Sequence, residues 1–131
     1  MRAAYLDTSV LVGIAFGEPG AAALARGVRG LDALFSATLL ESEFLAVAAR
    51  ENVLERLRPL LEPIRFVHPA RRLTPEDLAA LRHGRLRGAD LHHLSTALYV
   101  FPRPEEAFFL TLDAAQGAVA ARLGFRGRRD L

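Results

Sequence analysis

Two aspartates, Asp7 and Asp113, each follow a short apolar run that is typical of a buried strand. The runs are Ala3–Leu6, which continues as Leu-Asp-Thr-Ser, and Phe108–Leu112, which continues as Thr-Leu-Asp-Ala. In a parallel sheet the carboxyl ends of the strands meet at one edge, where α/β proteins bind their ligands. If the two strands are neighbours, the two carboxylates converge and repel each other unless one is protonated or a cation lies between them. A hard divalent cation, Mg²⁺ or Mn²⁺, is the natural occupant of such a pair.

Two further acids can join this pair from helices. Asp90 opens a predicted helix in which it shares one face with His93. In another predicted helix, over residues 38–50, Glu41 and Glu43 lie equally far from the centre of the apolar stripe, so periodicity does not choose between them. Each acid also has a simpler explanation, as a helix cap, a first-turn charge or a solvated flank. His93 is a candidate for proton transfer, but a packed core histidine is the commoner case.

These acids must be positioned by strands and helices, which alternate along the chain. Strands are predicted over residues 3–6, 34–37, 64–67 and 108–112. Helices are predicted from about residue 10 to Gly17 and over residues 21–28, 38–50, 52–61, 74–83, 89–99 and 114–123, with Thr8 or Ser9, Thr38 and Thr74 as their N-terminal caps. The alternation indicates a single α/β domain over residues 1–131, with a mainly parallel sheet of four or five strands flanked by helices. The basic tail, residues 124–131, is expected to be mobile.

Composition narrows the classes of function. At 131 residues, with 51% hydrophobic and 24% charged residues, the chain fits one globular domain with a real core. All 17 basic residues are arginines, and the absence of lysine excludes P-loop nucleotidases and Schiff-base enzymes. The absence of cysteine excludes disulfides, thiolate nucleophiles, iron–sulfur clusters and cysteine-based zinc sites. An all-arginine surface suits phosphate and nucleic acid, although it can equally reflect a biased genome or a hot habitat.

The sequence shows no signal for export or membrane insertion. The N-terminus lacks a basic segment followed by an apolar one, and no apolar stretch approaches the roughly 18 residues needed to span a bilayer. A cytoplasmic location without membrane association is therefore expected.

Four motifs in order resemble the PIN domain and, more closely, the VapC-type toxins of bacterial and archaeal toxin–antitoxin pairs. They are Leu-Asp-Thr-Ser around Asp7, Glu-Phe-Leu-Ala-Val-Ala-Ala-Arg from Glu43, Asp-Leu-His-His-Leu-Ser-Thr-Ala from Asp90, and Thr-Leu-Asp ending at Asp113. Each motif is weak alone, but their order and spacing together are specific. The resemblance covers essentially the whole chain.

The resemblance implies a ribonuclease that depends on Mg²⁺ or Mn²⁺. The four acids around the ion would be Asp7, Glu43, Asp90 and Asp113, and the family pattern favours Glu43 over Glu41. Supporting residues would be Thr8, Ser9, Thr111, His93 and Gln116, the last through a metal-bound water. His92 departs from the apolar residue usual at its position, which puts local packing in doubt more than catalysis.

The resemblance also implies partners. RNA would be the substrate, and Arg82, Arg85 and Arg87, close before Asp90, could supply positive charge at the rim, as could the arginines of the tail. A cognate antitoxin protein and a homodimer are further expectations, which the apolar helices near the N-terminus and around residues 54–61 could serve.

Other functions remain open at this stage. A phosphatase or phosphotransferase with Asp7 as nucleophile is disfavoured, because Ser9 stands where the second acid is usual and no lysine exists. A non-catalytic RNA- or protein-binding module is disfavoured by the full set of acids. A housekeeping RNA-processing nuclease would have the same sequence features, and a structural domain whose acids are caps would bind no metal.

Overall fold

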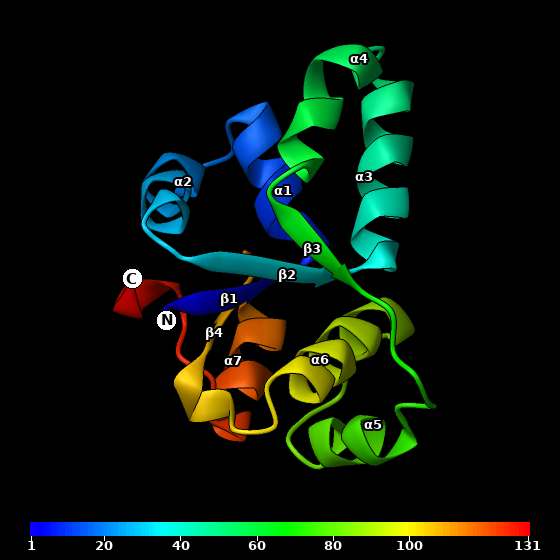
Figure 1. Ribbon diagram of the computed structural model, residues 1–131, viewed down its shortest axis with the longest axis vertical. Helices are drawn as coiled ribbons and strands as arrows, with labels where there is room; N and C mark the ends of the chain where they lie inside the picture. Colours follow the sequence, from blue (N-terminus) through cyan, green and yellow to red (C-terminus); the bar gives the residue numbers. More distant parts are fainter.

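Four parallel strands form the centre of the molecule. The computed structural model describes all residues, 1–131. The sheet consists of β1 (Ala3–Leu6), β2 (Ala33–Ala37), β3 (Ile64–Val67) and β4 (Phe108–Leu110), in the order β3-β2-β1-β4 (Figure 1). The predicted parallel sheet and the four strands are thus confirmed, and β1 and β4 are indeed neighbours.

Helices cover both faces of the sheet. The α-helices are α1 (Thr8–Phe16), α2 (Ala21–Arg29), α3 (Thr38–Arg50), α4 (Leu54–Leu57), α5 (Thr74–Leu81), α6 (Gly88–Val100) and α7 (Ala114–Leu123), and the 3-10 turns are η1 (Arg58–Leu61), η2 (Pro104–Glu106) and η3 (Arg128–Asp130). Helices α1 to α4 lie on one face and α5 to α7 on the other (Figure 1). This is the predicted α/β class.

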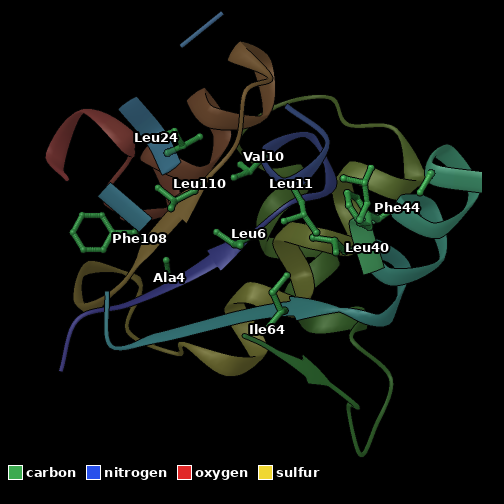
Figure 2. Close-up of a cluster of buried hydrophobic side chains, with 12 residues drawn as sticks. Ala4, Leu6, Val10, Leu11, Leu24, Leu40, Phe44, Ile64, Phe108 and Leu110 are labelled. Atoms are coloured by element: carbon green, nitrogen blue, oxygen red, sulfur yellow. The ribbon is translucent and has the colours of Figure 1, made fainter. Parts of the chain in front are cut away.

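Side chains of the central strands alternate between two cores. Ala4 and Leu6 of β1 belong to a cluster with α1, α2 and α3, whereas Tyr5 belongs to a second cluster on the face of α6 and α7. Figure 2 shows the first cluster, in which Leu40 and Phe44 of α3 are fully buried. Burial of these two residues fixes the rotation of α3, and therefore the direction in which its acids emerge.

Several predicted boundaries are wrong for identifiable reasons. Strand β4 ends at Leu110 and not at residue 112, because its partner β1 ends at the paired residue Leu6 and the chain turns into α1. The helix predicted over residues 52–61 begins at Leu54 and becomes a 3-10 turn at Arg58, before Pro59, whose ring removes a backbone donor.

The predicted threonine caps are also wrong. Thr8, Thr38 and Thr74 are the first residues of their helices, and the capping positions are held by Asp7, Ala37 and Leu73. No side-chain capping bond is made at any of these three positions. The polar groups at the start of α1 bind other side chains instead. The Ser9 hydroxyl, for example, donates a hydrogen bond to the Asp7 carboxylate.

The C-terminal segment is ordered, contrary to the expected mobile tail. Phe125 is buried, and Arg126 exchanges backbone hydrogen bonds with the strand: its carbonyl accepts from Phe109 at 2.8 Å. Leu131 packs against Gly27 of α2, where a β-carbon would lie 2.7 Å from a Leu131 methyl carbon. The apolar residues Phe125 and Leu131 therefore anchor a segment whose sequence is otherwise basic.

No single helix combines the length and apolar composition needed to cross a membrane. The consecutive helices α1 and α2 meet both criteria only when taken together, and they are bent by 112° relative to each other.

Candidate active site

The carboxyl edge of the sheet holds Asp7 directly after β1, beside the end of β4. The Asp7 N–H donates to the carbonyl of Leu110 at 3.1 Å, which joins the two strand ends. Its Oδ1 accepts a hydrogen bond from the Ser9 hydroxyl at 2.6 Å, and its Oδ2 accepts one from the Thr111 hydroxyl at 2.9 Å. Asp7 is only 4% exposed. Its carboxylate is therefore held in a fixed orientation at the bottom of the site.

Asp113 and Asp90 are tied to the same edge through Gln116. Asp113 caps α7, since its Oδ1 accepts from the Gln116 N–H at 2.9 Å. The buried Gln116 amide donates to the carbonyl of Asp90 at 3.2 Å, and its oxygen lies 3.0 Å from the Thr111 hydroxyl oxygen. Gln116 therefore fixes the relative positions of α6 and α7, and its expected contact to a metal-bound water stays a prediction.

Glu43 reaches the site from α3. Its Oε1 accepts from the Thr8 hydroxyl at 2.7 Å and lies 3.6 Å from Nε2 of His93. The side chain is 40% exposed. Glu41 instead lines a separate cavity with Arg58. The structure thus distinguishes two glutamates that helical periodicity left equivalent.

This difference predicts unequal effects of two matched substitutions. We expect Glu43→Gln to lower metal-dependent RNA cleavage by at least about tenfold, because it removes a charge from the acid cluster. Glu41→Gln should change the rate by less than about twofold. Both rates should be measured on one single-stranded RNA oligonucleotide under the same metal concentration. Equal losses in the two variants would contradict this assignment.

The acids act on one another electrostatically. Burial raises the pKa of Asp7 from its ordinary value of 3.8 to about 6, against the hydrogen bonds from Ser9 and Thr111, and the charge of Asp90 adds to the increase. Burial also raises the pKa of Asp90, with further contributions from the charges of Asp113 and Glu43. All four acids therefore contribute to one region of negative potential.

Little positive charge neutralises this region. None of Asp7, Asp90 and Asp113 forms a salt bridge, and Glu43 faces only His93. Arg87 lowers the pKa of Asp90, but this effect is smaller than the increases caused by burial and by the charge of Asp113. A cation at this edge would relieve the repulsion that the buried carboxylates experience.

The residues fit a hard divalent cation by donor type and charge. No three acidic or histidine side chains converge closely enough in this conformation to hold one ion together. Mg²⁺, however, is commonly bound through one or two carboxylates and keeps several waters. The all-oxygen donor set matches that mode of binding.

His93 is a buried, hydrogen-bonded residue and matches the simpler of its two interpretations. Its Nδ1 lies 2.7 Å from the Tyr5 hydroxyl, and its Nε2 lies 3.1 Å from the Thr8 hydroxyl. Burial lowers its pKa from 6.5 to about 4, against the opposite effect of Glu43. The imidazole is therefore neutral at physiological pH.

Tyr5 is the one residue of this network that sequence reasoning missed. Tyr5 is fully buried, and its hydroxyl faces His93. The available signal was a single polar group within the apolar strand Ala-Ala-Tyr-Leu, directly before Asp7. A buried phenol hydroxyl requires a partner.

Arginines lie on two sides of the acids. Arg82, Arg85 and Arg87 are exposed in the segment between α5 and α6, as the sequence placed them. On the other side, a cleft of about 520 Å³ runs between α7 and the C-terminal segment, and its lining includes Asp113, Arg128 and Arg129. The cleft therefore opens at one of the four acids.

Comparisons with known proteins agree with this arrangement. A family model described as the PIN domain matches residues 4–100. That range contains Asp7, Glu43 and Asp90, whereas Asp113 lies beyond it. A search of curated proteins found no match.

A solved structure of VapBC-1 from nontypeable Haemophilus influenzae is similar to this chain. The likeness has a TM-score of 0.68 and covers 98% of this chain and 99% of that one, at 14% sequence identity. At this identity the likeness concerns the fold.

Proposed function

Because the chain belongs to the PIN domain family, we propose that it is a Mg²⁺- or Mn²⁺-dependent endoribonuclease that hydrolyses RNA phosphodiester bonds. The observation that carries the proposal is the cluster of Asp7, Asp90, Asp113 and Glu43 at the carboxyl edge of the sheet, without a neutralising salt bridge from any arginine. A structural role as a helix cap accounts poorly for Asp7, because burial disfavours its ionised form.

The four acids would surround the ion, with Asp7 as the anchored ligand and one or two carboxylates in direct contact with it. When bound, the ion activates water for attack on phosphorus and neutralises charge on the phosphate oxygens. Ser9 and Thr111 hold the Asp7 carboxylate by hydrogen bonds to both of its oxygens. Little free energy is therefore needed to orient the carboxylate when a cation binds. Asp113 and Asp90, on α7 and α6, are linked through Gln116. No residue of the site is assigned as a general base.

A toxin of the VapC type is the specific role that we propose. The likeness to VapBC-1 in fold and in length supports this role. A cognate antitoxin protein as partner and a homodimer in the cytoplasm are part of the same proposal. Most of the apolar residues in the helices near the N-terminus and around residues 54–61 are buried or packed against the core, but Phe16 of α1 and Leu60 of η1 remain exposed.

The proposal is tested by titrating Mn²⁺ into the protein by calorimetry and by incubating it with a mixed-sequence single-stranded RNA. We expect saturable binding and cleavage that requires the metal. A folded protein that binds no Mn²⁺ and leaves RNA intact would contradict the nuclease assignment. Cleavage without any effect on growth when the protein is produced in cells would instead favour a housekeeping nuclease over a toxin.

The arginines beside the site predict a salt-dependent effect on RNA binding. We expect Arg85→Ala/Arg87→Ala to raise KM for RNA several-fold with little change in kcat, because phosphate contacts position the substrate. The logarithm of the RNA association constant falls with the logarithm of the salt concentration. This slope should become less steep by about 1 to 1.5, since each phosphate contact to a single strand contributes about 0.7. The matched control is Arg56→Ala/Arg58→Ala, at α4 and η1 on the opposite face of the sheet (Figure 1), which should leave KM and slope unchanged.

A further inference from the structure

A continuous row of hydrogen bonds connects the core of the sheet to Glu43. It starts at the backbone N–H of Ala37, which lies 3.1 Å from the Tyr5 hydroxyl oxygen, and passes through His93 and Thr8 to the Glu43 carboxylate. Its members come from β2, β1, α6, α1 and α3, five elements that are far apart in the sequence. The row can orient its last member, Glu43, only if each group donates a hydrogen bond to the next group in the row.

We infer that Tyr5 and His93 are positioning residues for Glu43, acting through Thr8, and that His93 is held as the tautomer with its proton on Nε2. The role in positioning Glu43 rests on the proposed function, whereas the tautomer does not. The direction of the last hydrogen bond, from Thr8 to Glu43, determines the rest of the row.

The Glu43 carboxylate can only accept, so the Thr8 hydroxyl proton is donated to its Oε1 at 2.7 Å. The Thr8 oxygen, 3.1 Å from His93 Nε2, then has no further proton to donate, so Nε2 carries the proton of this hydrogen bond. A neutral imidazole has one acceptor nitrogen and one donor nitrogen, so Nδ1 accepts. The Tyr5 hydroxyl, 2.7 Å from Nδ1, donates to it, and the Tyr5 oxygen accepts from the Ala37 N–H.

The opposite tautomer would leave a buried nitrogen unsatisfied. A proton on Nδ1 of His93 would leave Nε2 as an acceptor that faces the Thr8 oxygen at 3.1 Å, although the one hydroxyl proton of Thr8 is already donated to the Glu43 carboxylate. Nε2 would then be buried without a donor, which is costly, and the structure has no unpaired buried side-chain polar atom.

The row determines which oxygen of Glu43 is available to a ligand. Oε1 is occupied by Thr8 and lies 3.6 Å from His93 Nε2. Oε2 has no hydrogen-bond partner in the protein, and the side chain is partly exposed. Glu43 would therefore present Oε2 to a cation, with its rotamer selected before the cation arrives. Groups that orient metal ligands in this way commonly change metal affinity or activity by about 10- to 100-fold when removed.

The tautomer is tested by NMR on the ¹⁵N-labelled, metal-free protein at neutral pH. We expect the His93 ring proton to be bonded to Nε2, with Nδ1 unprotonated. A proton on Nδ1 would overturn the inference, whether or not the protein cleaves RNA.

The positioning role is tested with a pair of substitutions at His93. His93→Gln keeps an N–H donor near the position of Nε2, whereas His93→Leu fills a similar volume without one. We expect His93→Leu to weaken Mn²⁺ binding and to lower kcat, each by about tenfold, at unchanged KM for RNA. His93→Gln should recover most of both. Tyr5→Phe should resemble His93→Leu in direction.

Ser95→Ala serves as the control for a purely structural effect. Ser95 is buried on the same helix and donates to Asp77, away from the acids. We expect it to lower Tm without changing Mn²⁺ affinity or kcat. Equal losses in His93→Gln and His93→Leu, or none in either, would overturn the positioning role. If His93→Leu does not fold, Thr8→Val compared with Thr8→Ser tests the same hydroxyl, and Mn²⁺ affinity remains a readout even if RNA is not the substrate.

Discussion

Asp7→Asn is expected to abolish metal-dependent RNA cleavage while the protein stays folded. Asp7 is the most buried of the four acids, and both of its oxygens are already oriented by Ser9 and Thr111. The amide keeps the size of the side chain but removes the charge that would bind a cation. Because even groups outside the ligand shell commonly contribute ten- to a hundredfold, the loss in cleavage rate should be at least about 100-fold. Calorimetric Mn²⁺ titration should show a parallel loss of binding.

A second aspartate supplies the control. Asp32 precedes β2 at the amino edge of the sheet, where its carboxylate accepts from the Arg2 N–H at 2.6 Å. Asp32→Asn should therefore leave cleavage and Mn²⁺ binding unchanged. Cleavage by Asp7→Asn at a rate within a few-fold of the wild type would show that the cluster is not the site of hydrolysis.

The parts of the fold that could be predicted are those that local patterns determine. Ala3–Leu6 is apolar throughout, and residues 114–123 form an alanine-rich helix that ends at Gly124, so β1 and α7 were predicted with their actual bounds. The alternation of strands and helices predicts a parallel sheet, although not that β1 and β4 are neighbours in it. A parallel sheet brings the ends of these strands to one edge, which is why Asp7 could be placed at the candidate site from sequence.

The parts that could not be predicted depend on contacts between distant segments. Thr8 has the residue type of a helix cap, but its hydroxyl bonds Glu43, 35 residues away. Helical periodicity left Glu41 and Glu43 equivalent, and only the packing of α3 on the sheet separates them. The basic C-terminal segment is held in place by the packing of Leu131 against Gly27, a contact that the sequence around neither residue predicts.

The same network predicts an unusual dependence of stability on pH in the metal-free protein. The pKa of Asp7 is about 6 in the folded state and near 3.8 when unfolded, so the folded state binds the extra proton between these values. This contribution to the free energy of unfolding is present below pH 3.8 and is lost as pH rises to about 6. Its magnitude is about 3 kcal/mol, because one pKa unit corresponds to about 1.4 kcal/mol. The raised pKa of Asp90 acts in the same direction.

His93 acts in the opposite direction over nearly the same range. Its pKa is about 4 in the folded state and near 6.5 when unfolded, so here the unfolded state binds the extra proton. This contribution is present above pH 6.5 and is lost as pH falls to about 4, again by about 3 kcal/mol. The two contributions therefore largely cancel in the wild type, whose free energy of unfolding should change little between pH 4 and 6.5.

Single substitutions should separate the two contributions. In Asp7→Asn the contribution of His93 is opposed only by that of the less buried Asp90, so the free energy of unfolding should rise from pH 4 to 6.5. In His93→Gln only the acids remain, so it should fall over the same range. Urea unfolding in the presence of a chelator at four pH values measures both slopes. Slopes of the same sign in the two variants would contradict the opposed titrations. Opposite slopes would show that burial disfavours the charged form of both a carboxylate and an imidazole at this edge of the sheet.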